Sequence, residues 1–259
     1  MPQVSPARVT IVLPAYELAG VIYDNLKRVA AAFGLSDRPE LVVVDDGSTD
    51  DTYREALRAA KEVDGTTVIR HDLNRGKGEA LFTGARSAGG DVVVFLDADL
   101  DLPPEQLPAV LAQLGDADVL VGAKRKSMSA GRYPLPRRLL SRLFSFLTVG
   151  VFRLPVRETQ TGLKILRRPV LDEVLPQMRI RGYAYDLEML VRAHRAGYVT
   201  REVPVDLGAG ASTAPLRIRM LWQMARDTIK LLWWVMSGKI PKLAQRSMGG
   251  IAPDRPTNP

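Results

Sequence analysis

The alternation of short apolar runs with segments of helical spacing limits the fold of this chain more than any other feature of its sequence. Four runs have the length and composition of buried strands: Val9–Leu13, Leu41–Val44, Thr67–Arg70 and Val92–Leu96. Three segments between them have helical spacing: Val21–Phe33, Thr52–Val63 and Gly78–Ala88. Strands and helices in alternation predict an α/β fold, with a mostly parallel central sheet flanked by crossover helices.

A polar cluster follows each predicted strand. The four clusters are Pro14–Glu17, Asp45–Asp50, His71–Lys77 and Asp97–Asp101. In the second cluster, Ser48 or Asp50 is expected to cap the helix that follows. Because ligands of parallel α/β sheets bind beyond the carboxyl ends of the strands, these clusters are candidates for one shared site.

The fourth cluster places Asp97, Asp99 and Asp101 at alternate positions after an unbroken apolar run. In extended chain the three side chains would share a face, whereas a bend after Asp97 would turn Asp99 and Asp101 onto one divalent ion. Hard oxygen ligands suit Mg²⁺ or Mn²⁺, and Mg²⁺ is usually held by one or two carboxylates together with substrate phosphates. The stretch therefore predicts a nucleotide diphosphate site. The alternative is a solvated acidic loop, because this pattern is short.

Composition excludes several classes. A chain of 259 residues that is 46% hydrophobic can bury the core of one large domain. The absence of cysteine excludes disulfides, thiolate metal sites and cysteine nucleophiles. The first ten residues contain no apolar segment of signal-peptide length, and the apolar stretch Ile229–Met236 is too short to span a bilayer, so no transmembrane segment is expected.

The two halves of the chain differ in charge. Residues 1–120 carry 11 Lys/Arg and 20 Asp/Glu, a net of −9, while residues 121–259 carry 25 and 9, a net of +16. The asymmetry indicates that the second half faces something anionic, such as a phosphate-bearing lipid, an anionic membrane or nucleic acid. A basic surface without a partner is the alternative.

Ordered motifs give the sequence a family resemblance. LPAY (Leu13–Tyr16), VVVDDGSTDDT (Val42–Thr52), NRGKGEA (Asn74–Ala80) and FLDADLD (Phe95–Asp101) strongly resemble family 2 glycosyltransferases of the GT-A fold, which is Rossmann-like. Five later segments resemble the polyprenyl-phosphate sugar synthases, which include dolichyl-phosphate glucosyl- and mannosyltransferases: Val121–Lys126, Pro136–Phe144, Glu158–Arg168, Gly182–Leu190 and Arg201–Val205. The resemblance covers Val9 to Ser212.

This resemblance implies a domain organisation. Residues 1–212 would form the GT-A domain, with a nucleotide-sugar-binding half (1–120) and an acceptor-binding half (121–212). Beyond the resemblance, the residue pattern itself predicts a C-terminal amphipathic helix over residues 213–240, at a membrane interface or dimer contact, and a flexible tail over residues 241–259.

The resemblance also implies roles for particular residues. Donor nucleotide-binding residues would be Pro14, Ala15, Tyr16, Glu17, Asp45, Asp46, Lys77, Asp97 and Ala98. Catalytic residues would be Asp97, Asp99, Gln160 and Lys164, and the metal ligands Asp99 and Asp101, although many relatives carry Gln at the last position.

Within that set, Asp46 with Asp45 beside it matches an acid that accepts a ring N–H of uracil or guanine. A turn and helix cap formed with Ser48 is an alternative role for Asp46. Lys77 would place a cation near phosphate or ribose, whereas Gln160 and Lys164 are candidates for the sugar or phosphate pocket.

Two motifs depart from the pattern of the family. Relatives usually continue PAYNEE, but here Glu17 takes the asparagine position and Leu18 the glutamate position, which removes the usual nucleotide contact unless Glu17 replaces it. The GSR of relatives appears as GAK, so Lys124 or Arg125 must supply the expected cation.

The acceptor side is strongly basic. Residues 124–168 contain 12 Lys/Arg and one acid, Glu158, with apolar residues at helical spacing. The expected ligands of acceptor phosphate and lipid are Lys124, Arg125, Arg137, Arg138 and Arg142. A core helix with a solvated basic face is the alternative.

A second amphipathic segment, Leu216–Met236, combines tryptophans with Arg and Lys. Such a segment favours the membrane interface, although the tryptophans would equally suit a dimer or a small membrane-protein partner. The expected location is peripheral, on the cytoplasmic face of the membrane.

The resemblance implies inverting transfer of a hexose from a nucleotide-diphosphate sugar to polyprenyl phosphate, with Mg²⁺ or Mn²⁺. The TQTGLK segment favours a UDP-sugar, with GDP-mannose open. A phosphate acceptor is already anionic, so no general base is required. Asp186 and Glu188 lie in the sequence region where related enzymes with hydroxyl acceptors have a general base, but they could equally be structural helix acids.

Rival functions remain. A family 2 transferase with a hydroxyl acceptor is the nearest, but the QxxRW pattern of processive synthases is absent. A sugar-1-phosphate nucleotidyltransferase would need a Gly-rich basic loop in place of LPAYELAG. A nucleic-acid-binding module would leave the acids without a role, so no nucleic acid is expected. An inactive membrane-associated scaffold has its support in Glu17 and Leu18.

Overall fold

The four apolar runs form strands, and the segments between them form helices. The computed structural model describes residues 8–34, 37–124, 150–182, 184–208 and 218–241. The first half contains β1 (Val9–Ala15), α1 (Ile22–Ala31), β2 (Glu40–Asp45), α2 (Thr52–Ala60), β3 (Thr66–Arg70), α3 (Lys77–Ser87) and β4 (Val92–Leu96). The predicted elements are confirmed, with α1 and α2 ending two or three residues early.

The later elements complete the same sheet. They are η2 (Pro104–Gln106), α4 (Leu107–Leu111), β5 (Val119–Lys124), β6 (Leu163–Arg167), α6 (Arg168–Val174), η5 (Leu175–Gln177), α7 (Tyr185–Arg195), β7 (Thr200–Val205) and α8 (Ile218–Met236). Strand order is β3-β2-β1-β4-β6-β5-β7, and β6 alone in this order runs antiparallel to both of its neighbours. The sheet is therefore mostly parallel, as the sequence predicts.

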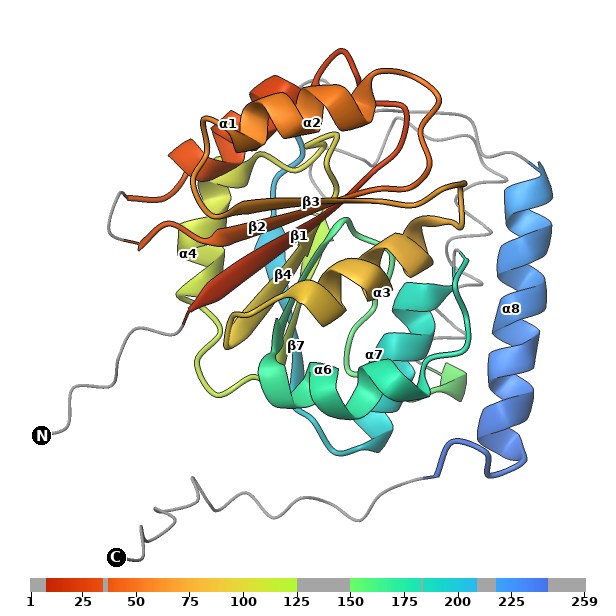
Figure 1. Ribbon diagram of the computed structural model, residues 1–259. Coiled ribbons are helices and arrows are strands. Elements are labelled where there is room, and N and C mark those ends of the chain that lie inside the picture. The colour runs from red at the N-terminus through yellow and green to blue at the C-terminus, as the bar shows by residue number, and fades with distance from the viewer. Residues whose placement is uncertain (1–7, 35–36, 125–149, 183, 209–217, 242–259) are drawn as a thin grey trace, which may run out of the picture.

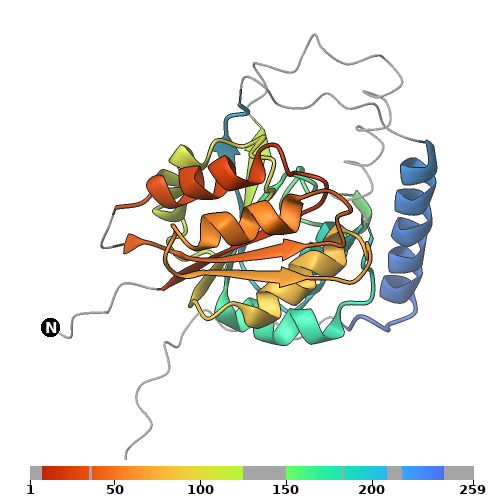
Figure 2. The same ribbon diagram turned by 45° about the horizontal axis from the view of Figure 1, so that its top comes forward.

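Helices cover both faces of the sheet. Alternate residues of β2 separate the two cores: Leu41 and Val43 pack with α1, α2 and α4, whereas Val42 and Val44 pack with α3, α6 and α7. Figures 1 and 2 show these two helical layers on opposite sides of the strands. Because both faces are covered, the central strands are apolar throughout rather than alternating.

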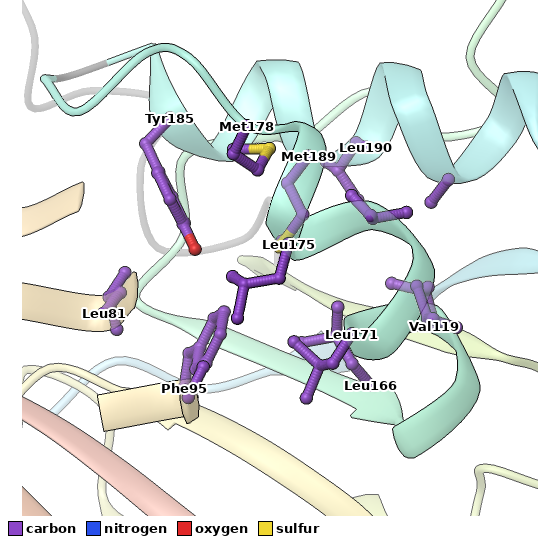
Figure 3. Close-up of a cluster of buried hydrophobic side chains, with 14 of the residues drawn as sticks. Leu81, Phe95, Val119, Leu166, Leu171, Leu175, Met178, Tyr185, Met189 and Leu190 are labelled. Carbon is purple, nitrogen blue, oxygen red and sulfur yellow. The ribbon is translucent and has the colours of Figure 1, made fainter. Parts of the chain in front are cut away.

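The core beneath α7 contains one polar atom of note. Tyr185 is directed toward Leu81 and Phe95 (Figure 3), and its hydroxyl is buried without a hydrogen-bond partner. Burial, followed by the nearby carboxylate of Asp186, raises the pKa of this hydroxyl, so it stays neutral.

At the start of α2, the two residues predicted to cap the helix make different hydrogen bonds. Asp50 accepts the N–H of Thr52, the first helical residue, at 3.0 Å, although the cap position itself is Asp51. The hydroxyl of Ser48 instead accepts the N–H of Glu17. Both predicted caps are therefore wrong as to the cap position, although Asp50 accepts a hydrogen bond from the first helical residue and Ser48 connects two loops.

Helix α8 packs against the outside of the domain. Leu231 is fully buried in the core that also contains α3, α6 and α7, and Leu232, Trp234 and Val235 pack partly against it. No helix among the described residues combines the length and hydropathy needed to cross a membrane. The predicted tail from residue 241 and the division at residue 120 stay predictions.

Candidate active site

The carboxyl ends of β1, β2 and β4 bring the predicted polar clusters to one edge of the sheet. Ala15 pairs with Asp45 in register, and Asp46 donates its N–H to the Ala15 carbonyl at 2.8 Å. Next to β1 on the other side, β4 ends at Leu96, directly before Asp97. Parallel strands thus place the first, second and fourth clusters beside one another, at the usual ligand-binding edge.

The first cluster is fastened to the second. Glu17 accepts two hydrogen bonds from Thr49, from N–H at 2.8 Å and from the hydroxyl at 2.9 Å. The N–H groups of Leu18 and Ala19 donate to Thr52 Oγ1 and Asp50 Oδ2. Glu17 holds a left-handed backbone conformation, with φ of 53°.

This geometry explains the altered family motif. Leu18 occupies the usual glutamate position and packs partly buried against the α1 core. The Glu17 carboxylate is engaged with the neighbouring loop. Of the other predicted donor contacts here, Tyr16 is 47% exposed, Pro14 is half-buried and Ala15 is buried.

Asp46 is buried and holds the third cluster in place. Its carboxylate accepts the backbone N–H groups of Arg75 at 3.0 Å and Gly76 at 2.7 Å. The ring of His71 lies between it and α3, with Nδ1 2.8 Å from Asp46 Oδ1 and Nε2 2.9 Å from Thr83 Oγ1. Sequence reasoning gave His71 no role, because a contact between two loops leaves no local signal.

Asp45 is fully buried beside Asp46. Its Oδ1 accepts the N–H of Ser48, and its Oδ2 lies 3.3 Å from Arg70 Nε. Gly47 has φ of 69°, and a Cβ there would meet the backbone of Leu73 at 2.3 Å. The second and third clusters are therefore packed backbone to backbone, which only glycine permits.

Lys77 and Asp97 meet at the centre of the edge. Lys77 Nζ lies 2.5 Å from Asp97 Oδ1, and 43% of the lysine side chain is exposed. Loss of surrounding water lowers the pKa of Lys77, but the carboxylates of Asp97, Asp186 and Asp99 outweigh this, and the pKa is raised overall. The lysine therefore stays charged.

A glycine of the antiparallel strand region makes room for Asp97. A Cβ on Gly162 would lie 2.5 Å from Asp97 Oδ2, and the carbonyl of Gly162 accepts the N–H of Asp97. Glycine is thus favoured at position 162 of the TQTGLK segment, because any side chain there would displace the Asp97 carboxylate.

The chain bends after Asp97, which decides between the two geometries that the sequence left open. Leu100 donates its N–H to the Asp97 carbonyl and has φ of 54°, and Asp101 donates its N–H to Asp99 Oδ1 at 3.3 Å. Ala98 is buried, and its carbonyl accepts a hydrogen bond from Asn25. Asp99 and Asp101 therefore belong to one turn.

The acids of this turn suit a divalent cation. Burial, then the charge of Asp97, and also that of Asp101, raise the pKa of Asp99, and a cation would relieve this crowding of negative charge. Over the described residues no three His, Asp or Glu side chains converge as a preformed cage. Two carboxylates that need substrate phosphates to complete the shell fit Mg²⁺ or Mn²⁺.

Lys164 is buried next to Lys77 and Asp97, close enough for their charges to act on it. Its side chain is almost fully buried, and Nζ donates to the Thr161 carbonyl at 2.6 Å and lies 2.8 Å from Asp186 Oδ2. Burial lowers the pKa of Lys164, and the carboxylate of Asp186 opposes that effect. Lys164 is therefore paired with an acid of α7, and its place in a sugar or phosphate pocket stays a prediction.

The two acids of α7 differ in environment. Glu188 is fully buried and accepts the backbone N–H groups of Arg179 and Ile180 as well as the guanidinium of Arg192. Asp186 pairs with Lys164 through Oδ2, while its Oδ1 is buried without a hydrogen-bond partner. Glu188 thus serves to hold the chain around it, whereas Asp186 lies at the floor of the candidate site, next to Lys164.

The acceptor side is described only in part. Gln160 is half-buried, with Nε2 3.9 Å from Met224 Sδ of α8. Lys124 is exposed at the end of β5. The remaining predicted acceptor residues, Arg125, Arg137, Arg138 and Arg142, lie outside the described residues.

The sheet order defines an α/β protein, and its acidic candidate site lies where ligands of such sheets bind. The chain belongs to glycosyl transferase family 2, whose model matches residues 10–175. It is 30% identical to glycosyltransferase AglD of Haloferax volcanii over 244 residues, which is 92% of this chain and 39% of that protein. It is 27% identical to the dolichol-phosphate mannosyltransferase of Pyrococcus furiosus over 253 residues, 95% of this chain and 69% of that protein.

A solved structure confirms the predicted GT-A fold. The glucosyl-3-phosphoglycerate synthase of Mycobacterium tuberculosis, in complex with Mn²⁺, UDP and phosphoglyceric acid, matches with a TM-score of 0.68 at 21% identity. The match covers 88% of this chain and 78% of that one. The chain spans well under half the length of the Haloferax relative and about two thirds of the Pyrococcus one.

Proposed function

We propose that this glycosyltransferase transfers a hexose from a nucleotide-diphosphate sugar to a polyprenyl phosphate, with inversion at the anomeric carbon. The name of the Pyrococcus relative, a dolichol-phosphate mannosyltransferase, supports a lipid-phosphate acceptor. The TQTGLK segment supports a UDP-sugar as donor. Direct in-line attack by the acceptor phosphate breaks the bond between sugar and diphosphate and inverts the configuration.

The donor half of the proposal rests on Lys77, Asp97 and Asp99. The exposed part of Lys77 supplies a cation beside the leaving diphosphate, and Asp97 holds that cation in place. Asp99, with Asp101, would hold Mg²⁺ or Mn²⁺, which when bound neutralises charge on the departing phosphates. Asp46 keeps the loop that carries Lys77 closed through its backbone contacts.

The acceptor half rests on the ion pair between Asp186 and Lys164. A hydroxyl acceptor needs a base to remove its proton, whereas a phosphate is already ionised. The two acids that could act as a general base are both paired with cations, Asp186 with Lys164 and Glu188 with Arg192. This pairing is the observation that favours a phosphate acceptor, with the basic segment from Lys124 onward as its binding region.

A family 2 transferase with a hydroxyl acceptor is the second candidate. Asp186 Oδ1 is buried without a hydrogen-bond partner, as a carboxylate awaiting a substrate hydroxyl would be. The glucosyl-3-phosphoglycerate synthase shares the fold, although the low identity extends the comparison no further. Location at the cytoplasmic face of a membrane is part of the first proposal, because its acceptor is a lipid.

The test is transfer of radiolabel from a panel of UDP- and GDP-sugars to a short-chain polyprenyl phosphate. The wild type is assayed with Mg²⁺, with Mn²⁺ and with chelator, beside Asp99→Ala. Labelled lipid from one donor, lost with chelator and in the variant, is the expected result. Transfer to a hydroxyl acceptor without labelling of the lipid would reject the first candidate in favour of the second.

A further inference from the structure

The outward face of α8 is apolar. Four side chains with helical spacing lie on it and are largely exposed: Trp222 (73%), Ile229 (66%), Trp233 (55%) and Met236 (78%). Positions that differ by 7, 11 and 14 residues share a helical face, and the stripe runs about 21 Å along the axis at 1.5 Å per residue. A continuous apolar stripe of this length on a surface marks a contact with another body.

The inward face of α8 is fixed to the domain, so the stripe is held facing outward. Leu231 is fully buried, and Asp227 and Thr228 are nearly so. Beyond the helix, the carbonyl of Ile240 accepts a hydrogen bond from Arg195 of α7 at 2.8 Å. These contacts anchor the C-terminal half of the helix and prevent it from rotating to bury the stripe.

The charged residues beside the stripe indicate which kind of partner covers it. Lys230 and Lys239 are exposed beside it, and Lys239 Nζ lies 3.9 Å from the centre of the Trp233 ring. The single acid between residues 213 and 253 is Asp227, which is buried on the inward face beside Arg226. A second copy of this chain would bring like charges together, whereas an anionic lipid surface complements them.

We propose that the outward face of α8 lies in the interface of an anionic bilayer. The tryptophans sit at headgroup level with Ile229 and Met236 in the acyl boundary, and the lysines contact lipid phosphate. Membrane binding by this face does not depend on the transfer reaction, but the role of this binding in catalysis rests on the proposed function.

The position of α8 explains how docking serves the site. Met224 of α8 contacts Gln160, and Figures 1 and 2 both show the helix on the side of the molecule toward which β2 and β3 point. A membrane on that side would place the acidic edge close to a lipid phosphate. The acceptor would then reach the donor without leaving its leaflet.

The sequence provides a direct probe of docking, because Trp222, Trp233 and Trp234 are the only tryptophans of the chain. Titration with phosphatidylcholine vesicles containing about one quarter phosphatidylglycerol should shift the emission to the blue, and brominated lipid should quench it. Pure phosphatidylcholine should bind more weakly, and added salt should weaken binding to the anionic vesicles.

Variants that keep all three tryptophans separate the two contributions. Ile229→Gln with Met236→Gln should weaken binding at least about tenfold, and Lys230→Gln or Lys239→Gln about fivefold each on anionic vesicles only. Leu57→Gln is the matched control, since Leu57 is an exposed apolar residue of α2 on the opposite layer. It should leave binding unchanged.

Two results would overturn the proposal. One is emission that does not respond to either vesicle. The other is a concentration-dependent dimer in sedimentation equilibrium that Ile229→Gln disperses while vesicles fail to bind, which would assign the face to a second copy. Transfer to a short-chain soluble acceptor keeps the two proposals distinct, because a protein that binds vesicles but transfers nothing retains the docking surface and refutes only the proposed function.

Discussion

The ammonium group of Lys77 lies 2.5 Å from a carboxylate oxygen of Asp97, so the first residue of α3 and the residue after β4 meet at the acidic edge of the sheet. The Asp97 carboxylate occupies the space that a side chain at position 162 would need, which Gly162 leaves open. The pair therefore fixes a cation beside two further acids, Asp99 and Asp101.

Replacing Lys77 by Met should lower kcat/KM about 100-fold, because the stabilisation of the leaving diphosphate that we propose for this charge is lost. The loss should fall mainly on kcat, and Lys77→Arg should restore part of it. Since the pKa of Lys77 is raised, the ammonium form persists as pH increases, and the ratio of wild-type to variant rates should stay constant from about pH 7 to 9.5. A ratio that falls across this range would show that Lys77 loses its proton.

Metal dependence should follow Asp99 more than Asp101. Chelator should abolish transfer, and Asp99→Asn should lower kcat about 100- to 1000-fold, whereas Asp101→Asn should cost about tenfold and shift the Mn²⁺ titration to higher concentration. Asp91→Asn is a matched control, because Asp91 lies before the amino end of the same strand and pairs with Arg8. Equal losses for all three variants would indicate an effect on folding.

Lys164 and Asp186 should behave as one unit in stability. Lys164→Met leaves the Asp186 carboxylate buried without its cation, and should lower the free energy of unfolding by about 3–5 kcal/mol. Adding Asp186→Asn to Lys164→Met removes that charge and should recover most of the loss, which urea unfolding of the two single variants and the double variant measures. Additive losses would show that the two residues are independent.

The sequence predicted which polar clusters meet at the acidic edge of the sheet, because the signals for them are local. Each apolar run of the first half is a strand, and each polar cluster follows directly, so parallel pairing alone brings Asp46 and Asp97 to the same edge. The sequence of this stretch allowed two geometries, an extended chain and the bend that brings Asp99 and Asp101 into one turn. Nothing in the local pattern decides the backbone angle of Leu100.

The features that the sequence does not reveal depend on pairing between residues far apart in the chain. β6 inserts antiparallel between β4 and β5, with Lys164 opposite Phe95, and no residue near position 164 signals that partner or direction. Because a side chain on a strand faces one of two layers, the sequence alone does not show that Lys164 faces α7 and pairs with Asp186. The contact of His71 with Asp46 was missed for the same reason, since it joins two loops.

The altered first motif gives a last prediction, which asks whether Glu17 contacts the donor or only braces the loop. Its carboxylate accepts two hydrogen bonds from Thr49, so Glu17→Ala should lower the free energy of unfolding by about 1 kcal/mol and raise the donor KM a few-fold. Glu17→Gln keeps an acceptor oxygen and should resemble the wild type in both measurements. If Glu17→Gln instead raises KM as much as Glu17→Ala while stability is kept, the negative charge itself serves the donor.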